Sequence, residues 1–251
     1  MHSDFTDKVV LITGGGAGIG QACAIEFAAA GAKVVISDIT EQSAKETIDM
    51  ITQAGGVASA VIGDVSQSAS VDAMVSEAVK LHGRLDIAVN NAGISAPLLP
   101  VGETDEADYD RLMGVNLKGV WLCMRRELQQ MTAQGGGNII NMASALSQRV
   151  VAGASFYVAS KFAVAGMTRT AAVEYGEQNI RINAICPGFV ETPLLVSSLD
   201  EAGIKQMASL HANKRLCSPA EIANAVLWMA SDSASACTGN LMNVDGGWNA
   251  Y

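Results

Sequence analysis

Residues 8–38, KVVLITGGGAGIGQACAIEFAAAGAKVVISD, predict one βαβ unit. The β-branched run KVVLIT ends at a group of glycines, a helix-like segment follows, and KVVISD has the pattern of a second buried strand. The spacing Gly14-x-x-x-Gly18-x-Gly20 permits a tight turn and lets backbone N–H groups at the start of the helix approach a phosphate. Because a strand precedes these glycines and a helix follows them, the pattern indicates a dinucleotide-binding turn.

Asp38 closes this unit about 20 residues after the glycines, where a carboxylate can accept hydrogen bonds from the two hydroxyls of a ribose. The same carboxylate would repel a 2′-phosphate, and neither Ala17 nor Ile39 supplies a cation to neutralise one. We therefore expect NAD rather than NADP. A purely structural role remains open, in which Asp38 caps the helix expected from about Glu41.

Strand and helix patterns alternate along the rest of the chain. Further apolar strands are expected within residues 56–65, 84–93, 137–144, 179–188 and 239–247, with helices near residues 42–54, 67–82, 105–132, 155–176 and 218–231. With the first two strands this predicts an α/β fold, a doubly wound, seven-stranded and mainly parallel sheet with helices on both faces. We expect a single domain over residues 1–251, with an insertion at about 193–214 that folds over the substrate as a lid.

The composition indicates a folded protein without nucleic-acid or membrane partners. Of the 251 residues, 49% are hydrophobic and 16% charged, which is typical of a globular chain with much covered surface. The net charge of −9 argues against nucleic acid and anionic membranes. No apolar run reaches the roughly 18 residues of a spanning helix. The N-terminal sequence MHSDFTDK lacks a signal-peptide pattern, so we expect a cytoplasmic protein.

Cysteines and histidines show no metal-binding or disulfide pattern. The cysteines are scattered and never form CxxC, and the histidines share no ligand spacing; these residues are Cys23, Cys123, Cys186, Cys217, Cys237, His2, His82 and His211. We expect neither disulfides nor a metal site.

Polar residues follow the expected strands at the edge where parallel sheets bind ligands. Asp64-Val65, the segment 90–93, Ser144 and Pro187-Gly188 each come at a strand end. Asn, Asp and Gly also favour turns and caps for backbone reasons alone, so each has a structural explanation by itself. Together at one edge they favour a ligand site.

Tyr157 and Lys161 are spaced i and i+4, so they project from one face of the helix expected from Ser155. A nearby ammonium favours the phenolate and would lower the pKa of the phenol from about 10 toward neutrality, where it can exchange protons. The hydroxyl of Ser144, just after the fifth strand, could face the same cleft. Because this spacing also occurs on solvated helix faces, the assignment depends on the rest of the chain.

Over essentially the whole chain these motifs resemble the short-chain dehydrogenase/reductase family. The matching residues are Thr13-Gly14-x-x-x-Gly18-Ile19-Gly20, Asp64-Val65, Asn90-Asn91-Ala92-Gly93, Asn116 of GVNLKGVW, Ser144, Tyr157-x-x-x-Lys161, and Pro187-Gly188 followed by Thr192. The resemblance implies a Rossmann fold, a nicotinamide cofactor and a homotetramer. The almost uncharged segment 155–175 fits a helix covered on both sides, as a subunit contact requires.

The resemblance also implies roles for single residues. Tyr157 would be the acid/base, Ser144 would polarise the substrate oxygen, Lys161 would bind the nicotinamide ribose and lower the tyrosine pKa, and Asn116 would hold a water of a proton relay. Asp38 would contact the adenosine ribose, Asn90 the adjoining ribose, and Val190 and Thr192 the carboxamide. The full cofactor-binding set is Gly14, Gly16, Gly18, Ile19, Gly20, Asp38, Asp64, Val65, Asn90, Ala92, Gly93, Tyr157, Lys161, Pro187, Gly188, Val190 and Thr192.

The expected reaction is interconversion of a secondary alcohol and a ketone with NAD. Candidate substrate contacts are Ser95, Leu146, Phe189 and Leu195, in largely apolar segments where Arg149 and His211 are the evident cationic candidates. A compact, mostly uncharged substrate follows, and a cyclic one is among the candidates. Two alternatives stay open: an NADPH-dependent carbonyl or 3-oxoacyl thioester reductase, disfavoured by Asp38, and a non-catalytic dinucleotide-sensing protein, which would not need Ser144, Tyr157 and Lys161.

Overall fold

The sheet has seven strands, all parallel. The computed structural model describes residues 4–197 and 199–250. The strands are β1 (Val9–Thr13), β2 (Lys33–Asp38), β3 (Val57–Ile62), β4 (Ile87–Asn90), β5 (Gly137–Met142), β6 (Ile180–Pro187) and β7 (Leu241–Val244). Their order is β3-β2-β1-β4-β5-β6-β7, and every neighbouring pair is parallel. The predicted doubly wound sheet is confirmed, and it is wholly rather than mainly parallel.

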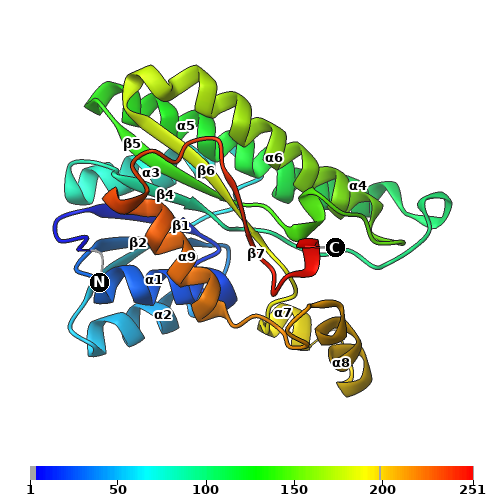
Figure 1. Cartoon of the computed structure of the whole chain (residues 1–251). Coiled ribbons are helices and arrows are strands. Elements are labelled where there is room, and N and C mark those ends of the chain that lie inside the picture. The colour runs from blue at the N-terminus through cyan, green and yellow to red at the C-terminus, as the bar shows by residue number, and fades with distance from the viewer. Residues whose placement is uncertain (1–3, 198, 251) are drawn as a thin grey trace.

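Helices cover both faces of this sheet (Figure 1). The helices α1, α2 and α9 lie on one face and α3, α5 and α6 on the other, where each group packs on its own apolar core. Their bounds are α1 (Gly18–Ala29), α2 (Glu41–Gln53), α3 (Ser68–His82), α4 (Glu106–Met113), α5 (Val120–Gln134), α6 (Ser155–Tyr175), α7 (Pro193–Val196), α8 (Glu201–Leu210) and α9 (Pro219–Ala230).

Strand β1 begins with four consecutive apolar residues because both of its faces are buried. In β1, Val10 and Ile12 belong to the core under α1 and α9, whereas Val9 and Leu11 belong to the core under α3 and α5. All of them are at most 1% exposed. This is why the strand pattern is a continuous apolar run instead of an alternating one.

The single helix expected near 105–132 is divided in the structure. Between α4 and α5 lies a π-helical turn, Gly114–Gly119, which contains Asn116. The Asn116 amide is fully buried and bonds both backbone groups of Ile94, with Nδ2 2.9 Å from the carbonyl oxygen and Oδ1 2.8 Å from the amide nitrogen. A π-turn inserts one residue into the helical register, and here it coincides with the residue that ties the helix to the loop after β4.

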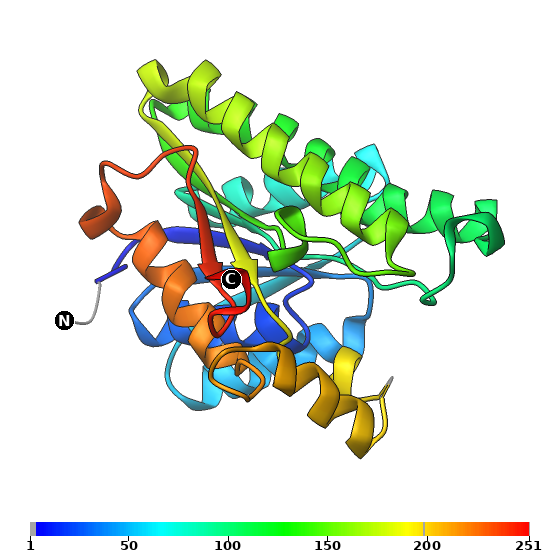
Figure 2. The same cartoon turned by 45° about the vertical axis from the view of Figure 1, so that its right-hand side comes forward.

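The segment predicted to form a lid contains two helices. Helix α7 ends at Val196 and α8 begins at Glu201, and together they extend from the main body beyond the end of β6 (Figures 1 and 2). The chain then returns through α9 and β7 to a final turn, Trp248–Ala250, in front of the sheet in Figure 2.

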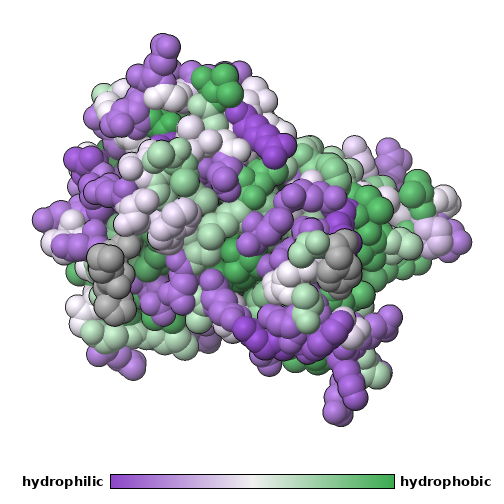
Figure 3. All heavy atoms as spheres, in the orientation of Figure 1, coloured by the Kyte–Doolittle hydropathy of each residue, from purple (hydrophilic) through white to green (hydrophobic). Residues whose placement is uncertain are grey.

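The molecular surface is mixed in character. The face in Figure 3 is mainly hydrophilic around α8, while apolar side chains reach the surface on its right-hand side, near α4. Within residues 4–197 and 199–250, the structure contains no helix that is both long enough and apolar enough to cross a membrane.

Candidate active site

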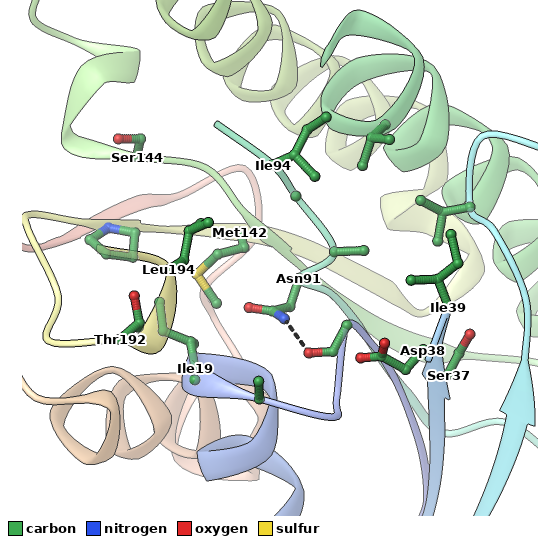
Figure 4. A pocket seen from close by; sticks show the side chains of 18 of the residues that line it. Ile19, Ser37, Asp38, Ile39, Asn91, Ile94, Met142, Ser144, Thr192 and Leu194 are labelled. Carbon is green, nitrogen blue, oxygen red and sulfur yellow. Dashed lines mark hydrogen bonds between the residues drawn. The ribbon is translucent and has the colours of Figure 1, made fainter. Parts of the chain in front are cut away.

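Two cavities meet at the carboxyl-terminal edge of the sheet. The first, about 410 Å³, lies over the ends of β1, β2 and β4 (Figure 4). The second, about 510 Å³, lies between residues 95–99, the start of α6 and the helices α7 and α8. Their linings share Ile19, Ser144, Tyr157, Thr192 and Leu194. A molecule in one cavity would therefore touch a molecule in the other beside Ser144 and Tyr157.

The glycine turn after β1 leaves little room for side chains at its glycine positions. Gly14 and Gly18 have φ of 63° and 55°, in the left-handed region that favours glycine. A Cβ on Gly16 would lie 2.8 Å from Oδ2 of Asp38, and one on Gly20 would overlap the carbonyl oxygen of Gly14. The turn leads directly into α1, whose N-terminal N–H groups thus face the cavity. These residues fit a dinucleotide pyrophosphate.

Asn91 holds this turn against the end of β4. Its Nδ2 donates to the carbonyl oxygen of Thr13 at 3.0 Å and to that of Gly14 at 3.1 Å. Figure 4 shows Asn91 beside the turn, with one such bond as a dashed line. The Thr13 hydroxyl in turn accepts from the backbone N–H groups of Asn91 and Ala92, both at 3.1 Å. The turn and the segment 91–93 therefore form one rigid wall of the cavity.

Asp38 lies at the rim of the first cavity, as predicted. Its Oδ2 accepts from the Gly16 N–H at 2.9 Å and its Oδ1 from the Thr40 N–H at 3.1 Å. The N-cap residue of α2 is Thr40, and that helix has no side-chain cap, so the alternative of Asp38 as a helix cap is wrong. Among the described lining residues Lys161 is the one basic side chain, and it lies at the other end near Tyr157.

Ser144 is held two residues beyond β5 in a short turn. Its Oγ accepts from the Leu146 N–H at 3.1 Å, and its own N–H donates to Oγ of Ser147 at 3.3 Å. The Ser147 hydroxyl donates to the backbone carbonyl of Lys161 at 2.9 Å. This turn is thereby tied to α6, which fixes Ser144 relative to Tyr157.

The electrostatics at Tyr157 differ from the prediction. Tyr157 is half-buried, and the surrounding protein raises the pKa of its phenol, an effect partly offset by a hydrogen bond with Ser144. The expected lowering of this pKa by Lys161 is wrong for the protein on its own. Lys161 Nζ lies 5.6 Å from the Tyr157 ring centroid and donates to the carbonyl of Met142 at 2.8 Å, so it is turned toward the backbone.

Lys161 is itself perturbed by burial. Lys161 is only 4% exposed, and the loss of solvent around its ammonium group lowers the pKa of Lys161 to about 8. The nearby Cys186 acts in the opposite direction. A buried ammonium of this kind loses its proton only slightly above neutral pH. The positive charge beside Tyr157 is therefore available at neutral pH and declines as the pH rises past about 8.

The side chains of Asn90 and Asn116 are engaged inside the protein and line neither cavity, so the contacts predicted for these two residues would need their backbone groups and stay predictions. Asn90 is 2% exposed, and its Nδ2 donates to Glu127 Oε2 and Asn141 Oδ1, each at 3.0 Å. It therefore faces the core under α5. Both the oxygen and the nitrogen of the Asn116 side-chain amide are hydrogen-bonded to the backbone of Ile94. This side chain therefore positions a residue of the cavity wall instead of contacting a ligand.

Most other predicted cofactor residues lie where expected. The lining of the first cavity includes Asp64, Val65, Ala92, Gly93, Pro187 and Thr192. Val190 lines the second cavity instead. Gly188 is a packing residue, because a Cβ there would lie 2.7 Å from Nε2 of His211 and 2.9 Å from Cα of Asp245.

The second cavity is lined mainly by apolar side chains. All four predicted substrate contacts, Ser95, Leu146, Phe189 and Leu195, line it. Sequence reasoning missed Asp105, Asp108 and Trp248, which also line it. Nothing in the local pattern around Trp248 indicates this cavity.

Neither of the two cationic candidates lines the second cavity. His211 is fully buried, with Nε2 accepting from the Phe189 N–H at 3.0 Å and Nδ1 2.5 Å from the carbonyl oxygen of Arg215. It is a core histidine that holds Phe189 in place. Arg149 is absent from the described lining.

The cysteines are free thiols, four of them buried and Cys237 half-buried. In the part of the chain that the structure describes, no three His, Cys, Asp or Glu side chains come together to hold a metal ion. His2 lies outside the described residues.

Comparisons with known proteins agree with this geometry. A family model described as "Enoyl-(Acyl carrier protein) reductase" matches residues 14–249. A short-chain dehydrogenase/reductase of Aspergillus oryzae is 44% identical over 96% of this chain and 94% of its own. The cyclohexanol dehydrogenase of an Acinetobacter species is 38% identical over 100% and 98%. The crystal structure of levodione reductase has a TM-score of 0.95 at 36% identity, covering 98% of this chain and 99% of that one.

Proposed function

The chain belongs to the short-chain dehydrogenase/reductase family, and within it we propose an NAD-dependent enzyme that interconverts a compact, uncharged cyclic alcohol and its ketone. The observation that carries this proposal is the junction of the two cavities at Ser144 and Tyr157. One cavity has a glycine turn and a rim carboxylate, and the other has apolar walls. The Tyr157 hydroxyl, which can donate and accept a proton, thus lies where a cofactor and a substrate would meet.

The first cavity supports NAD over NADP. Bound there, NAD would supply the nicotinamide C4 position that accepts the carbinol hydride of the substrate. Asp38 is already held by two backbone N–H groups, so its carboxylate is fixed at the rim and would repel a 2′-phosphate. No lysine or arginine lines this end of the cavity among the described residues.

The chain's own residues would handle the substrate's proton. In the oxidation direction the Tyr157 phenolate takes the hydroxyl proton, while the Ser144 hydroxyl donates to the substrate oxygen and fixes its position. Because burial raises the pKa of Tyr157, the phenolate needs a compensating positive charge, and Lys161 supplies one on the same helix face. In the reduction direction the Tyr157 phenol returns the proton to the ketone oxygen.

The second cavity supports a neutral, ring-shaped substrate. Its walls are mostly aliphatic and aromatic, and the charged side chains in its described lining are the carboxylates of Asp105 and Asp108. These would repel a carboxylate or a phosphate. The names of two relatives, cyclohexanol dehydrogenase and levodione reductase, point to six-membered rings as the first substrates to test.

The alternative of a carrier-protein-dependent reductase has less support. The family model's description names an acyl carrier protein, but Asp38 disfavours NADPH, and the second cavity is flanked by acidic residues instead of basic ones. An acidic entrance does not attract the phosphate-bearing arm of a carrier protein. NAD-dependent oxidation of cyclohexanol with no reduction of a 3-oxoacyl thioester would separate the two functions.

The central test is Tyr157→Phe, assayed with a panel of cyclic secondary alcohols by NADH absorbance. We expect NAD binding to be unchanged in calorimetry and turnover to fall by about 10²- to 10⁴-fold, the usual contribution of general acid–base catalysis. Tyr175→Phe, at the far end of the same helix, is the matched control and should keep full activity. A Tyr157→Phe variant with more than about a tenth of the normal rate would contradict the mechanism.

We also infer a homotetramer with a subunit contact on α5 and α6. Apolar side chains on these helices are open to solvent in the single chain: Trp121 is 47% exposed, Phe162 44% and Val173 86%. Burial of such a surface between copies would stabilise the assembly. Light scattering that gives a monomer mass at micromolar concentration would contradict this inference.

A further inference from the structure

We propose that Trp248, from the C-terminal turn, is a specificity-determining residue that sets the size limit of the substrate cavity. This rests on the proposed function. Trp248 is 5% exposed and lines the second cavity, although it is more than ninety positions after Tyr157 in the sequence. It belongs to the same small apolar cluster as Leu146, Phe189 and Tyr157. A C-terminal side chain thus contributes to the wall beside the reacting groups.

The indole is packed against the predicted substrate contacts. Its ring centroid lies 4.8 Å from that of Phe189 at an interplanar angle of 30°, and 6.1 Å from that of His211. His211 accepts a hydrogen bond from the Phe189 backbone, so the wall consists of aromatic rings that fix one another. Such a wall cannot yield to a larger ligand without displacing several buried groups.

The turn that carries Trp248 is held by hydrogen bonds and is joined to the turn that contains Ser144. Asp245 accepts from the N–H groups of Gly247 and Asn249, at 3.0 and 2.9 Å. Asn249 Nδ2 then donates to the carbonyl oxygen of Ala145 at 3.1 Å, in the residue next to Ser144. The position of the indole is therefore fixed relative to the serine that would hold the substrate oxygen.

The physical consequence is a limit on substrate size. Because Tyr157 and Ser144 would fix the reacting oxygen of the substrate, the rest of a substrate ring must extend into the space next to Phe189 and Trp248. A fused bicyclic alcohol extends farther from its reacting oxygen than a single six-membered ring, so its fit depends more on the room beside the indole. Replacing the indole by a methyl group opens that space and removes apolar contacts from the smaller ring.

The test compares cyclohexanol with 2-decalol as substrates for wild type, Trp248→Ala, Trp248→Phe and Trp228→Ala. Trp228 lies on α9, is 41% exposed and is absent from the described cavity lining, so it is the matched control. The measured quantity is the ratio of kcat/KM for the two alcohols. A ratio within one enzyme does not depend on the fraction of folded protein, so a merely structural role would not change it.

We expect Trp248→Ala to shift the ratio toward 2-decalol by at least about tenfold, within the 10- to 200-fold range of apolar pocket discrimination. Trp248→Phe should lie between wild type and the alanine variant, and Trp228→Ala should match wild type. A ratio that stays within twofold in Trp248→Ala would overturn the assignment of Trp248 alone. If wild type oxidises neither alcohol, the proposed function fails instead, so the two failures are distinguishable.

Discussion

Replacing Glu127 by glutamine should make the protein more stable above neutral pH. Glu127, on α5, is 1% exposed; its Oε2 accepts from Asn90, and its Oε1 and the Asn90 Oδ1 are both buried without a hydrogen-bond partner. Burial raises the pKa of Glu127 from 4.5 to about 7, and the Asn90 bond offsets this only in part. A neutral side chain with both a donor and an acceptor suits this site better than a carboxylate.

The magnitude follows from proton linkage. Below pH 4.5 the carboxyl is protonated in both the folded and the unfolded chain, so the folded state is not penalised. As the pH rises from 4.5 through about 7, the unfolded chain loses its proton first, and the free energy of unfolding falls. The full loss is the pKa difference multiplied by 1.36 kcal/mol per unit, or about 3 kcal/mol. The glutamine variant has no such titration.

The assay is thermal unfolding by circular dichroism from pH 5 to pH 8, at one fixed protein concentration. The midpoint of Glu127→Gln should exceed that of wild type by an amount that grows with pH, reaching roughly 6–12 °C at pH 8. Glu177→Gln, at an exposed position, is the matched control and should follow the wild-type curve. Parallel pH curves for wild type and Glu127→Gln would refute the argument that the folded protein holds a proton at this site.

Two further predictions concern the cofactor and the direction of the reaction. Asp38→Ser should raise the Kd for NAD by about 10- to 100-fold, because a charged hydrogen bond to a ribose is lost. The same variant should reduce the preference of the enzyme for NAD over NADP. Calorimetry with both cofactors tests this, and an unchanged Kd for NAD would argue against the ribose contact. Because burial raises the pKa of Tyr157, kcat/KM for alcohol oxidation should increase from pH 6 to about pH 8, where Lys161 begins to lose its charge. Ketone reduction, which uses the phenol, should not increase over this range. Two profiles that rise together would contradict a single tyrosine acting in both directions.

Local sequence patterns determined the architecture of this protein. The inner strands β1 and β2 are buried on both faces, so each is a short apolar run that can be recognised without knowing its neighbours. The glycine turn is equally local, since Gly14 and Gly18 need the left-handed backbone whatever surrounds them. The spacing of Tyr157 and Lys161 on one helix, and the place of Ser144 after a strand, likewise depend on a few neighbouring residues.

Only the tertiary structure decided where the polar side chains point and what surrounds them. Asn90 turns into the core toward Glu127, and Asn116 to the backbone of Ile94, although both stand in segments that end at the cavity. Trp248 joins the substrate wall through contacts with Phe189, far away in sequence. Burial likewise raises the pKa of Tyr157 where a local rule about neighbouring charges predicts the opposite. Side-chain direction and desolvation depend on atoms from segments that are distant in sequence. Backbone conformation and strand burial depend mainly on the residues within each segment.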